Sequence, residues 1–257
     1  MKTPLTLVAA AETHVGRRSQ NEDCHGVDLR HGLFLVADGM GGYEGGEVAS
    51  SLAAGTMLDF IARDARDPDG TWPLKAQPGR SYDENLLAAA VRAAHLEIAA
   101  RRDGEERVLC EMGSTVAAVL CRGSDAVVAH VGDSRIYRLR GGELKQLTRD
   151  HSLQAEMAAQ GLQWPHRNVI TRALGIPSNH TPDVARLGLE EGDVFLLCSD
   201  GLYEVTPDAV LASLLSEKDL GRAARLLVEE ALKRGASDNV TVVVLRAQSS
   251  ESPSTSP

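Results

Sequence analysis

Acidic residues stand beside several apolar runs of the chain, where buried strands would end or begin. Asp38 and Asp200 each follow such a run and each precede a glycine, in GLFLVADG and DVFLLCSDG. Asp238 comes just before the last apolar run, and Glu22-Asp23 follows the first loop. Any single Asp-Gly pair fits an ordinary turn. Two at equivalent strand ends favour a shared site, where glycine lets the backbone approach a ligand.

Carboxylates that converge from the ends of several strands repel one another unless cations neutralise their charge. Oxygen ligands of this kind suit Mg²⁺ or Mn²⁺ and not zinc. Two such ions about 4 Å apart can bridge a water, lower its pKa and direct it at a phosphorus or carbonyl centre. These residues therefore predict metal-assisted hydrolysis.

The spacing of apolar residues predicts the elements that would position these carboxylates. Apolar or alternating runs predict strands, at residues 5–10, 32–37, 115–121, 126–131, 135–140, 193–198 and 239–245. Helical spacing predicts two pairs of helices, at 47–63 with 84–101 and at 206–215 with 220–233. Sheets covered by helix pairs predict an α+β layered sandwich.

Three connecting segments carry predictions of their own. The Gly132-Asp133-Ser134 turn is short enough to join strands 126–131 and 135–140 as an antiparallel hairpin. The irregular residues 153–180 are expected to form an outlying flap. Residues 248–257, rich in Ser and Pro, predict a disordered tail, which leaves 1–247 as a single domain.

The composition narrows the classes of function. The 257 residues include 27 Lys and Arg against 36 Asp and Glu, for a net charge of −9. Nucleic acids and anionic membrane surfaces attract clustered cations, so neither is expected as a partner. No apolar run approaches the ~18 residues of a membrane span. Four widely separated cysteines without a Cys-x-x-Cys pair indicate a reduced chain in the cytoplasm.

Seven ordered motifs between Glu12 and Leu245 resemble those of the metal-dependent serine/threonine protein phosphatases of the 2C type. The motifs are Gly16-x-Arg18-x-x-x-Glu22-Asp23, Asp38 to Gly42, Gly113-Ser114-Thr115, Val131 to Arg135, Leu147 to Ser152, Asp200-Gly201-Leu202 and Ser237-Asp238-Asn239. The set is highly specific, and the chain is similar to free-standing bacterial members. The resemblance implies a four-layer α+β sandwich, in which two mainly antiparallel sheets pack together between helix pairs.

The family pattern also implies which residues hold the metal ions. Asp38 would bridge two divalent cations, Mn²⁺ or Mg²⁺. The Gly39 carbonyl and Glu22 would bind one of them, and Asp200 and Asp238 would bind the other.

The same pattern implies a third metal position and a phosphate contact. Asp133 matches the third metal position, while Asp23 and Glu204 would either support the ligands or join that third ion. Arg18 matches the arginine that grips the substrate phosphate, because its planar fork suits a bidentate contact. With Asp38, it forms the expected catalytic pair.

The activity implied by the resemblance is hydrolysis of phosphoserine and phosphothreonine in proteins. A metal-bridging water or hydroxide would attack phosphorus directly, without a covalent enzyme intermediate. The expected partners are phosphorylated proteins. By removing their phosphate groups, the enzyme would oppose a Ser/Thr protein kinase. The expected oligomeric state is a monomer.

Two alternatives remain open at this stage. One is a catalytically weak pseudophosphatase that acts as a binding module, for which the only signs are Met40 and Tyr43, where some relatives carry histidine. The other is a cysteine-dependent phosphatase, because Cys24 and Arg30 have the Cys-x5-Arg spacing. Asp28, between them, would repel the phosphate.

Overall fold

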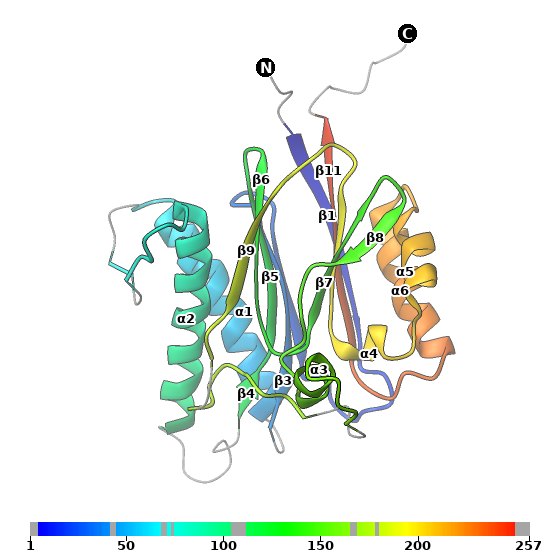
Figure 1. Ribbon diagram of the computed structural model, residues 1–257, viewed down its shortest axis with the longest axis horizontal. Helices are drawn as coiled ribbons and strands as arrows, with labels where there is room; N and C mark the ends of the chain where they lie inside the picture. Colours follow the sequence, from blue (N-terminus) through cyan, green and yellow to red (C-terminus); the bar gives the residue numbers. More distant parts are fainter. Residues whose placement is uncertain are drawn as a thin grey trace.

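Two β-sheets pack face to face, and helices cover the outer face of each sheet, so the molecule has four layers (Figure 1). The computed structural model describes residues 5–41, 45–67, 71–72, 75–103, 112–164, 169–177 and 180–249. This architecture confirms the α+β sandwich expected from the strand and helix pattern.

The first sheet has five strands in the spatial order β1-β11-β10-β7-β8, all antiparallel to their neighbours. Their bounds are β1 (Leu5–His14), β7 (Arg135–Arg140), β8 (Glu143–Gln146), β10 (Val194–Cys198) and β11 (Val240–Ser249). The central strands β10 and β11 are apolar over almost their whole length because both of their faces are buried.

The second sheet has six strands, with the order β2-β3-β5-β6-β9 and the short β4 paired to β3. Their bounds are β2 (Asp23–Asp28), β3 (Leu33–Met40), β4 (Gly113–Ser114), β5 (Val116–Arg122), β6 (Asp125–Val131) and β9 (Asp183–Gly188). Strands β3, β5 and β6 lie in the middle of this sheet and bury nearly every residue.

Helices cover the two sheets in pairs (Figure 1). Helices α1 (Gly45–Asp64) and α2 (Tyr82–Asp103) cover the second sheet, while α5 (Asp208–Leu215) and α6 (Leu220–Lys233) cover the first. The Asp219 side chain caps α6 by accepting a hydrogen bond from the Arg222 N–H. Two shorter helices, α3 (Leu153–Ala159) and α4 (Asp200–Tyr203), lie in connections.

Three apolar cores separate the four layers. The innermost core lies between the sheets and includes Phe34, Ile136, Phe195 and Val243. A second core lies between the second sheet and helices α1 and α2, and a third between the first sheet and helices α5 and α6. Packing on both faces of both sheets holds the strand ends in fixed relative positions.

The predicted hairpin of residues 126–140 is wrong, because its two strands belong to different sheets. β6 pairs with β5 and β9, whereas β7 pairs with β10 and β8. Gly132 has a φ of 98°, and the Ser134 hydroxyl is hydrogen-bonded to that of Thr115 (2.7 Å). The turn therefore carries the chain from one sheet to the other and leaves Asp133 between them.

The strands that the sequence pattern missed lie mostly at sheet edges. β2 and β9 are the two ends of the second sheet, and β8 is one end of the first. Edge strands face solvent on more sides, so their sequences DCHGVD, DVARLG and ELKQ show no apolar run.

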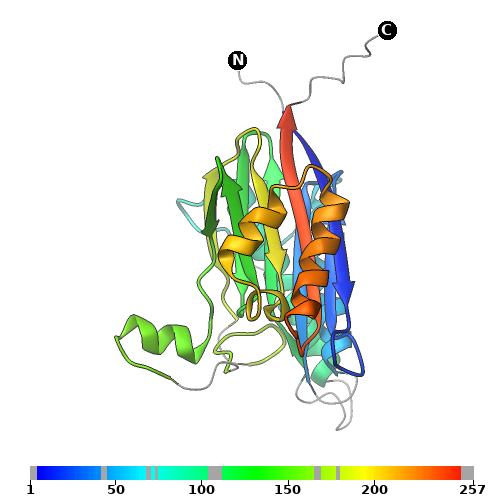
Figure 2. The ribbon, with the colours of Figure 1, turned by 90° about the vertical axis from the view of Figure 1, so that its right-hand side faces the viewer.

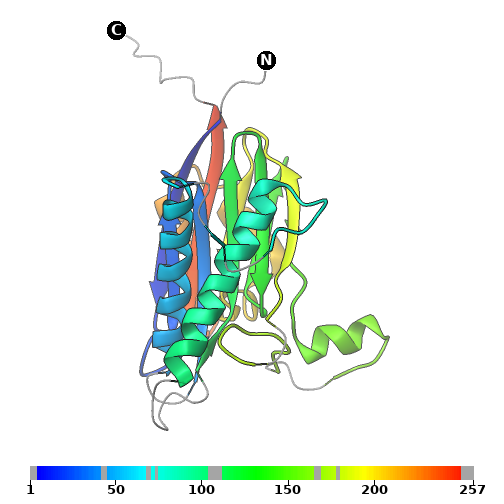
Figure 3. The ribbon, with the colours of Figure 1, turned by 90° about the vertical axis from the view of Figure 1, so that its left-hand side faces the viewer.

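The flap segment contains the helix α3, which stands away from the layered body (Figures 2 and 3). None of its residues is buried. At the C-terminus, Gln248 and Ser249 pair with β1 as the end of β11, which corrects the prediction of a tail beginning at 248. The rest of the predicted tail, 250–257, lies outside the described residues. Within the described part of the chain, no helix has the length and apolar character needed to cross a membrane.

Candidate active site

The acidic residues singled out in the sequence meet at one edge of the two packed sheets. Asp38 is near the end of β3 and is the direct cross-strand partner of Asp23 in β2. Asp200 follows β10, and Asp238 precedes β11. Since β10 and β11 are antiparallel neighbours, the end of one lies beside the start of the other. Asp133 reaches the same edge from the turn that crosses between the sheets.

The electrostatics of the cluster show how closely the carboxylates approach one another. Burial raises the pKa of Asp38 well above its ordinary value, and the negative charges of Asp23, Asp200, Asp133 and Asp238 raise it further. Burial, followed by the charges of Asp133 and Asp238, raises the pKa of Asp200 to about 8. Carboxylates in this state bind either protons or cations.

The donor set fits divalent cations. Asp200 Oδ1 is buried and has no hydrogen-bond partner among the described residues. Such an orphaned acceptor is costly unless a ligand satisfies it. The charged groups that raise its pKa are the carboxylates of Asp133, Asp238, Glu204 and Asp23, and carboxylate oxygens are the ligands that Mg²⁺ and Mn²⁺ prefer.

The backbone around Asp38 is held by the motif Gly113-Ser114-Thr115. The Asp38 N–H donates to Thr115 Oγ1 (3.0 Å), and the Thr115 N–H donates to the Asp38 carbonyl (2.8 Å). The Ser114 hydroxyl also donates to this carbonyl (3.2 Å). Since Thr115 Oγ1 is hydrogen-bonded to Ser134, this motif links Asp38 to the turn that carries Asp133. The sequence marked these motifs but not this supporting role.

Asn239 fixes the loop that carries Glu22 and Arg18. Its Nδ2 donates to the carbonyls of Val15 and Gln20 (2.9 Å each), and its Oδ1 accepts from the Glu22 N–H (2.8 Å). The only sequence signal for this role was the place of Asn239 directly after Asp238.

Arg18 stands at the solvent-facing side of the cluster. Its Nη2 donates to Asp238 Oδ2 (2.7 Å), and its side chain is 60% exposed. The Asp238 carboxylate raises the pKa of Arg18. A guanidinium in this position can contact an anion that approaches from solvent.

Glu204 and Asp133 line a small hollow at the same edge. The hollow has a volume of about 220 Å³ and is lined by both residues and by Asp150 and Tyr203. Burial, followed by the charge of Asp150, raises the pKa of Asp133 to about 6. Arg135 donates to both oxygens of Asp150 and lies 3.6 Å from the centre of the Tyr203 ring. The structure thus brings both residues of the expected third position together.

Comparison with known proteins finds similarity to one family over nearly the whole chain. Residues 11–240 match the protein phosphatase 2C family. The chain belongs to that family. The resemblance inferred from the motifs, and the enzyme class that it implies, are thereby confirmed.

Relatives of the chain in this family are bacterial enzymes. The serine/threonine protein phosphatase PstP of Mycobacterium tuberculosis is 36% identical over 253 residues, which cover 95% of this chain but only 45% of PstP. The serine/threonine phosphatase stp of Listeria monocytogenes is 33% identical over 249 residues, covering 92% of this chain and 94% of stp. The chain thus spans about half of PstP and almost all of stp.

Solved structures of family members superpose closely on this chain. The catalytic domain of PstP in complex with two manganese ions gives a TM-score of 0.82 at 35% identity, covering 95% of this chain and 99% of that one. PppA of Pseudomonas aeruginosa, described as a regulatory component of a secretion system, gives 0.80 at 34% identity, covering 96% and 100%.

Two glycines of this phosphatase 2C domain bring its backbone close to Glu22. The Gly39 N–H donates to the Glu22 carbonyl (3.0 Å). A Cβ atom on Gly39 would lie 2.0 Å from the Gly46 carbonyl oxygen, and one on Gly46 would lie 2.2 Å from Glu22 Oε2. No side chain fits at either position without displacing the Glu22 carboxylate or the backbone.

Gly46→Ala is therefore expected to weaken metal-dependent activity. The new methyl group displaces Glu22, and the Mn²⁺ concentration for half-maximal activity should rise by about 10–100-fold. The control is Gly55→Ala in the same helix, where a Cβ meets nothing within 4 Å. An equal effect of both substitutions would attribute the change to α1 in general and contradict the role of Gly46.

A second group of potential ligands, His130, His151 and Asp183, offers ligand atoms within 4.8 Å of one another. The Gly132 N–H donates to His151 Nδ1 (3.1 Å), so in the neutral ring the proton sits on Nε2, which lies 3.3 Å from Asp183. A cation at Nε2 would need the lone pair that this proton occupies. The backbone N–H of His151 also donates to the Gly132 carbonyl (3.0 Å). His151 therefore holds the turn before Asp133 through both its ring and its backbone.

Cys24 lies in β2 and not in a phosphate-binding loop. Its thiol is half-buried, donates to the His25 carbonyl (3.9 Å) and packs against the core under α1. Burial raises the pKa of this thiol, which disfavours the nucleophilic thiolate. An extended strand also cannot curl its N–H groups around a phosphate.

Cys24→Ser is expected to leave turnover within about threefold of wild type, because Cys24 lies in an extended strand and burial disfavours its thiolate. The measurement is kcat/KM on a phosphothreonine peptide, compared with that of the wild-type protein. Complete loss of turnover in a folded Cys24→Ser protein would restore the cysteine-dependent mechanism.

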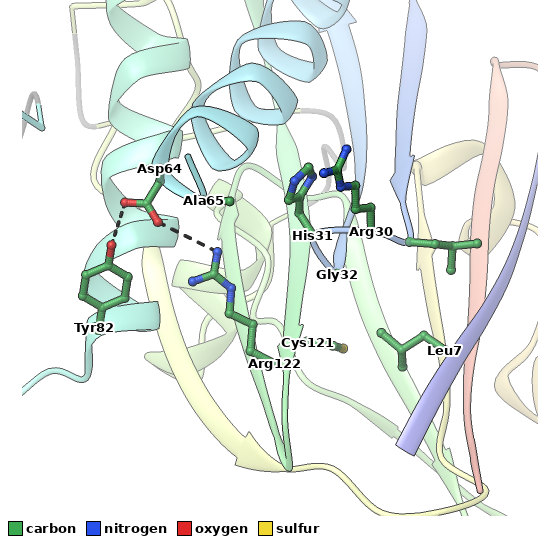
Figure 4. Close-up of a pocket in the computed structure, with 10 residues that line it drawn as sticks. Leu7, Arg30, His31, Gly32, Asp64, Ala65, Tyr82, Cys121 and Arg122 are labelled. Carbon is green, nitrogen blue, oxygen red and sulfur yellow. Dashed lines mark hydrogen bonds and ion pairs between the residues drawn. The ribbon is translucent and has the colours of Figure 1, made fainter. Parts of the chain in front are cut away.

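The pocket drawn in Figure 4 is lined by none of the carboxylates of the cluster. It has a volume of about 470 Å³, and Asp64 forms part of its wall together with Tyr82 and Arg122. Asp64 accepts from the Tyr82 hydroxyl (2.7 Å) and pairs with Arg122 at 3.9 Å. Because these groups satisfy one another, the pocket offers no comparable set of unsatisfied carboxylates.

Proposed function

We propose that this chain is a protein phosphatase that hydrolyses phosphoserine and phosphothreonine with the help of divalent cations. The observation that carries the proposal is the buried carboxylate cluster around Asp38, with the orphaned Asp200 Oδ1 inside it and Arg18 at its mouth. The two manganese ions bound by the PstP catalytic domain support it further.

Each acidic residue has a place in this proposal. Asp38 would bridge two ions, with Glu22 and the Gly39 carbonyl on one side and Asp200 and Asp238 on the other. Asp133 and Glu204 would serve a third ion, while Asp23 supports the ligands from β2. The Ser199 hydroxyl donates to Asp23 Oδ2 (2.7 Å) and holds that carboxylate in place.

The bound cations would supply a water of lowered pKa and neutralise phosphoryl charge. Arg18 would bind two phosphoryl oxygens with its fork and hold the phosphorus in line with the attacking oxygen. The bond from water oxygen to phosphorus forms as the bond from phosphorus to the serine or threonine oxygen breaks. The attacking water gives up a proton to solvent and the leaving oxygen takes one from solvent, so the products are the free hydroxyl and phosphate, and no covalent bond to the protein forms.

The cellular setting is a further part of the proposal. The substrates would be proteins phosphorylated by a Ser/Thr protein kinase, which this phosphatase opposes as a monomer in the cytoplasm. Cys24, Cys121 and Cys198 are free thiols, in keeping with a reducing compartment.

Phosphate release from peptides tests the proposal. The protein is treated with a chelator, desalted and assayed on phosphothreonine and phosphotyrosine peptides with and without Mn²⁺. Release from phosphothreonine that requires Mn²⁺ is the expected result. No release under any condition would favour the pseudophosphatase, and metal-independent release from phosphotyrosine would favour a Cys24 nucleophile.

Arg18→Lys should raise KM for a phosphothreonine peptide more than it lowers kcat. Lysine keeps the charge but loses the second hydrogen bond of the fork, which is expected to lower kcat/KM about tenfold. Arg17→Lys, at the exposed neighbouring position, is the matched control. Equal KM values for wild type and Arg18→Lys would contradict the proposed contact between Arg18 and the substrate phosphate.

A further inference from the structure

A pocket outside the carboxylate cluster gathers positive charge on a chain whose net charge is −9. It has a volume of about 480 Å³ and lies between the loop before α2, the helix itself and the segment before β9. We call it the cation pocket and define it by Lys75, Arg80, Ala88, Arg92 and Pro182. Its cations come from two elements that are held together by specific contacts.

Asn85 holds the loop of the cation pocket against α2. This buried side chain accepts from the Gln77 N–H (2.7 Å) and donates to the carbonyls of Arg80 (3.3 Å) and Ser81 (3.1 Å). The backbone from Gln77 to Ser81, which includes Arg80, is therefore positioned without any ligand.

Arg92 is held by a stack of two histidine rings. It donates to Nε2 of His180, whose ring stacks on His95 with 3.6 Å between ring centres. His95 Nδ1 accepts from the Gly175 N–H (3.1 Å), which fixes the ring. Burial, followed by the positive charges of His180 and Arg92, lowers the pKa of His95 to about 4. The stacked rings thus fix one N–H edge of the Arg92 guanidinium, and its other N–H groups can contact a ligand.

No carboxylate of the described residues forms an ion pair with the three cations of the pocket. Lys75, Arg80 and Arg92 each lie farther than 4.0 Å from such oxygens, unlike arginines such as Arg135 and Arg140, whose carboxylate partners lie at 2.6–2.7 Å. Glu84 offsets one of the three positive charges, since the charge of Arg80, after hydrogen bonds from Ser81, helps to lower the pKa of Glu84. The remaining positive charges repel one another. An anion in the pocket would remove this repulsion.

The shape of the cation pocket indicates the class of anion. Its volume falls within the range of small-molecule sites and exceeds what a single inorganic phosphate fills. Two arginine forks match phosphate oxygens, and Lys75 adds a point charge. Ala88 and Pro182 supply an apolar wall against which an organic group can pack.

We propose that the cation pocket binds an organic phosphate of about nucleotide size, carrying two or more negative charges. Arg80 and Arg92 contact its phosphates, Lys75 neutralises the remaining charge, and its organic part packs on Ala88 and Pro182. The site is separate from the carboxylate cluster and does not depend on the proposed phosphatase activity.

The test is calorimetric titration of the metal-free protein with ADP, with adenosine and with pyrophosphate. Without metal, the carboxylate cluster repels these anions, and no chelation of Mn²⁺ interferes. ADP should bind at one site, adenosine should not bind, and pyrophosphate should bind more weakly than ADP. Arg80→Gln should weaken ADP binding about tenfold, as expected for the loss of a bidentate charged contact.

The matched control is Lys145→Gln, which removes one positive charge from an exposed position on β8. It should leave ADP binding unchanged. Absence of saturable ADP binding, or equal weakening by Arg80→Gln and Lys145→Gln, would overturn the proposal. Equal affinities for pyrophosphate and ADP would overturn the part of it that concerns the organic group.

Discussion

Asp38→Asn should abolish phosphate release while leaving the fold intact. The side chain lies at the centre of the cluster and interacts with four other carboxylates, so its loss removes the ligand proposed to bridge both ions. We expect kcat/KM on a phosphothreonine peptide to fall by roughly 10³-fold or more. The backbone of Asp38 remains held by Thr115, and asparagine has nearly the same volume.

The control for this substitution is Asp59→Asn, on the exposed side of α1. It makes the same chemical change away from the cluster and should retain wild-type turnover. Turnover of the Asp38→Asn protein within about tenfold of wild type would contradict the proposed bridging role of Asp38. Circular dichroism and thermal unfolding of each protein separate loss of function from loss of fold.

The metal-free protein should lose stability as the pH rises from 7 to 8.5. Asp200, with its pKa raised to about 8, and Asp38, with its pKa also raised well above the ordinary value, bind protons more tightly when folded than when unfolded. Their stabilising effect is fully present below the unfolded pKa and disappears as the pH rises through the folded pKa. Unfolding free energy should therefore fall across this interval.

The interval begins at pH 7 because buried histidines produce the opposite trend at lower pH. Burial lowers the pKa values of His95 and His151 to about 4. Below about pH 6.5 these histidines are protonated in the unfolded chain but neutral in the folded protein, so they lower the free energy of unfolding. This effect weakens as the pH rises towards 6.5. Above that pH the histidines are neutral in both states, whereas the folded carboxylate cluster still binds more protons than the unfolded chain does.

Thermal unfolding with and without Mn²⁺ measures this effect. Each kcal/mol of lost stability lowers Tm by about 2–4 °C for a domain of this size. Mn²⁺ should replace the protons, so the increase in Tm that it causes should be larger at pH 8.5 than at pH 7. Metal-free Asp38→Asn should show a flatter pH dependence than wild type. A metal-free wild-type Tm that rises between pH 7 and 8.5 would contradict the account.

The edges and connections of the fold were harder to predict than its centre. The runs around Phe34, Phe195 and Val243 are buried on both faces, so apolar sequence alone marked β3, β10 and β11. The edge strands β2, β8 and β9 lack this signal because half of their surroundings is solvent. The 126–140 hairpin failed because a short turn can join two sheets as readily as two neighbouring strands.

By itself, the sequence determined the family, the layered fold and the set of acidic residues with Arg18, because residue types at strand ends and ordered motifs carry that information directly. Only the tertiary structure decided how these residues are held. The link from Asp38 through Thr115 to Ser134, the bracing of the 15–22 loop by Asn239, and the position of Asp133 between the sheets each join segments distant in the chain. Such contacts depend on how the two sheets pack, and no local pattern of residues encodes them.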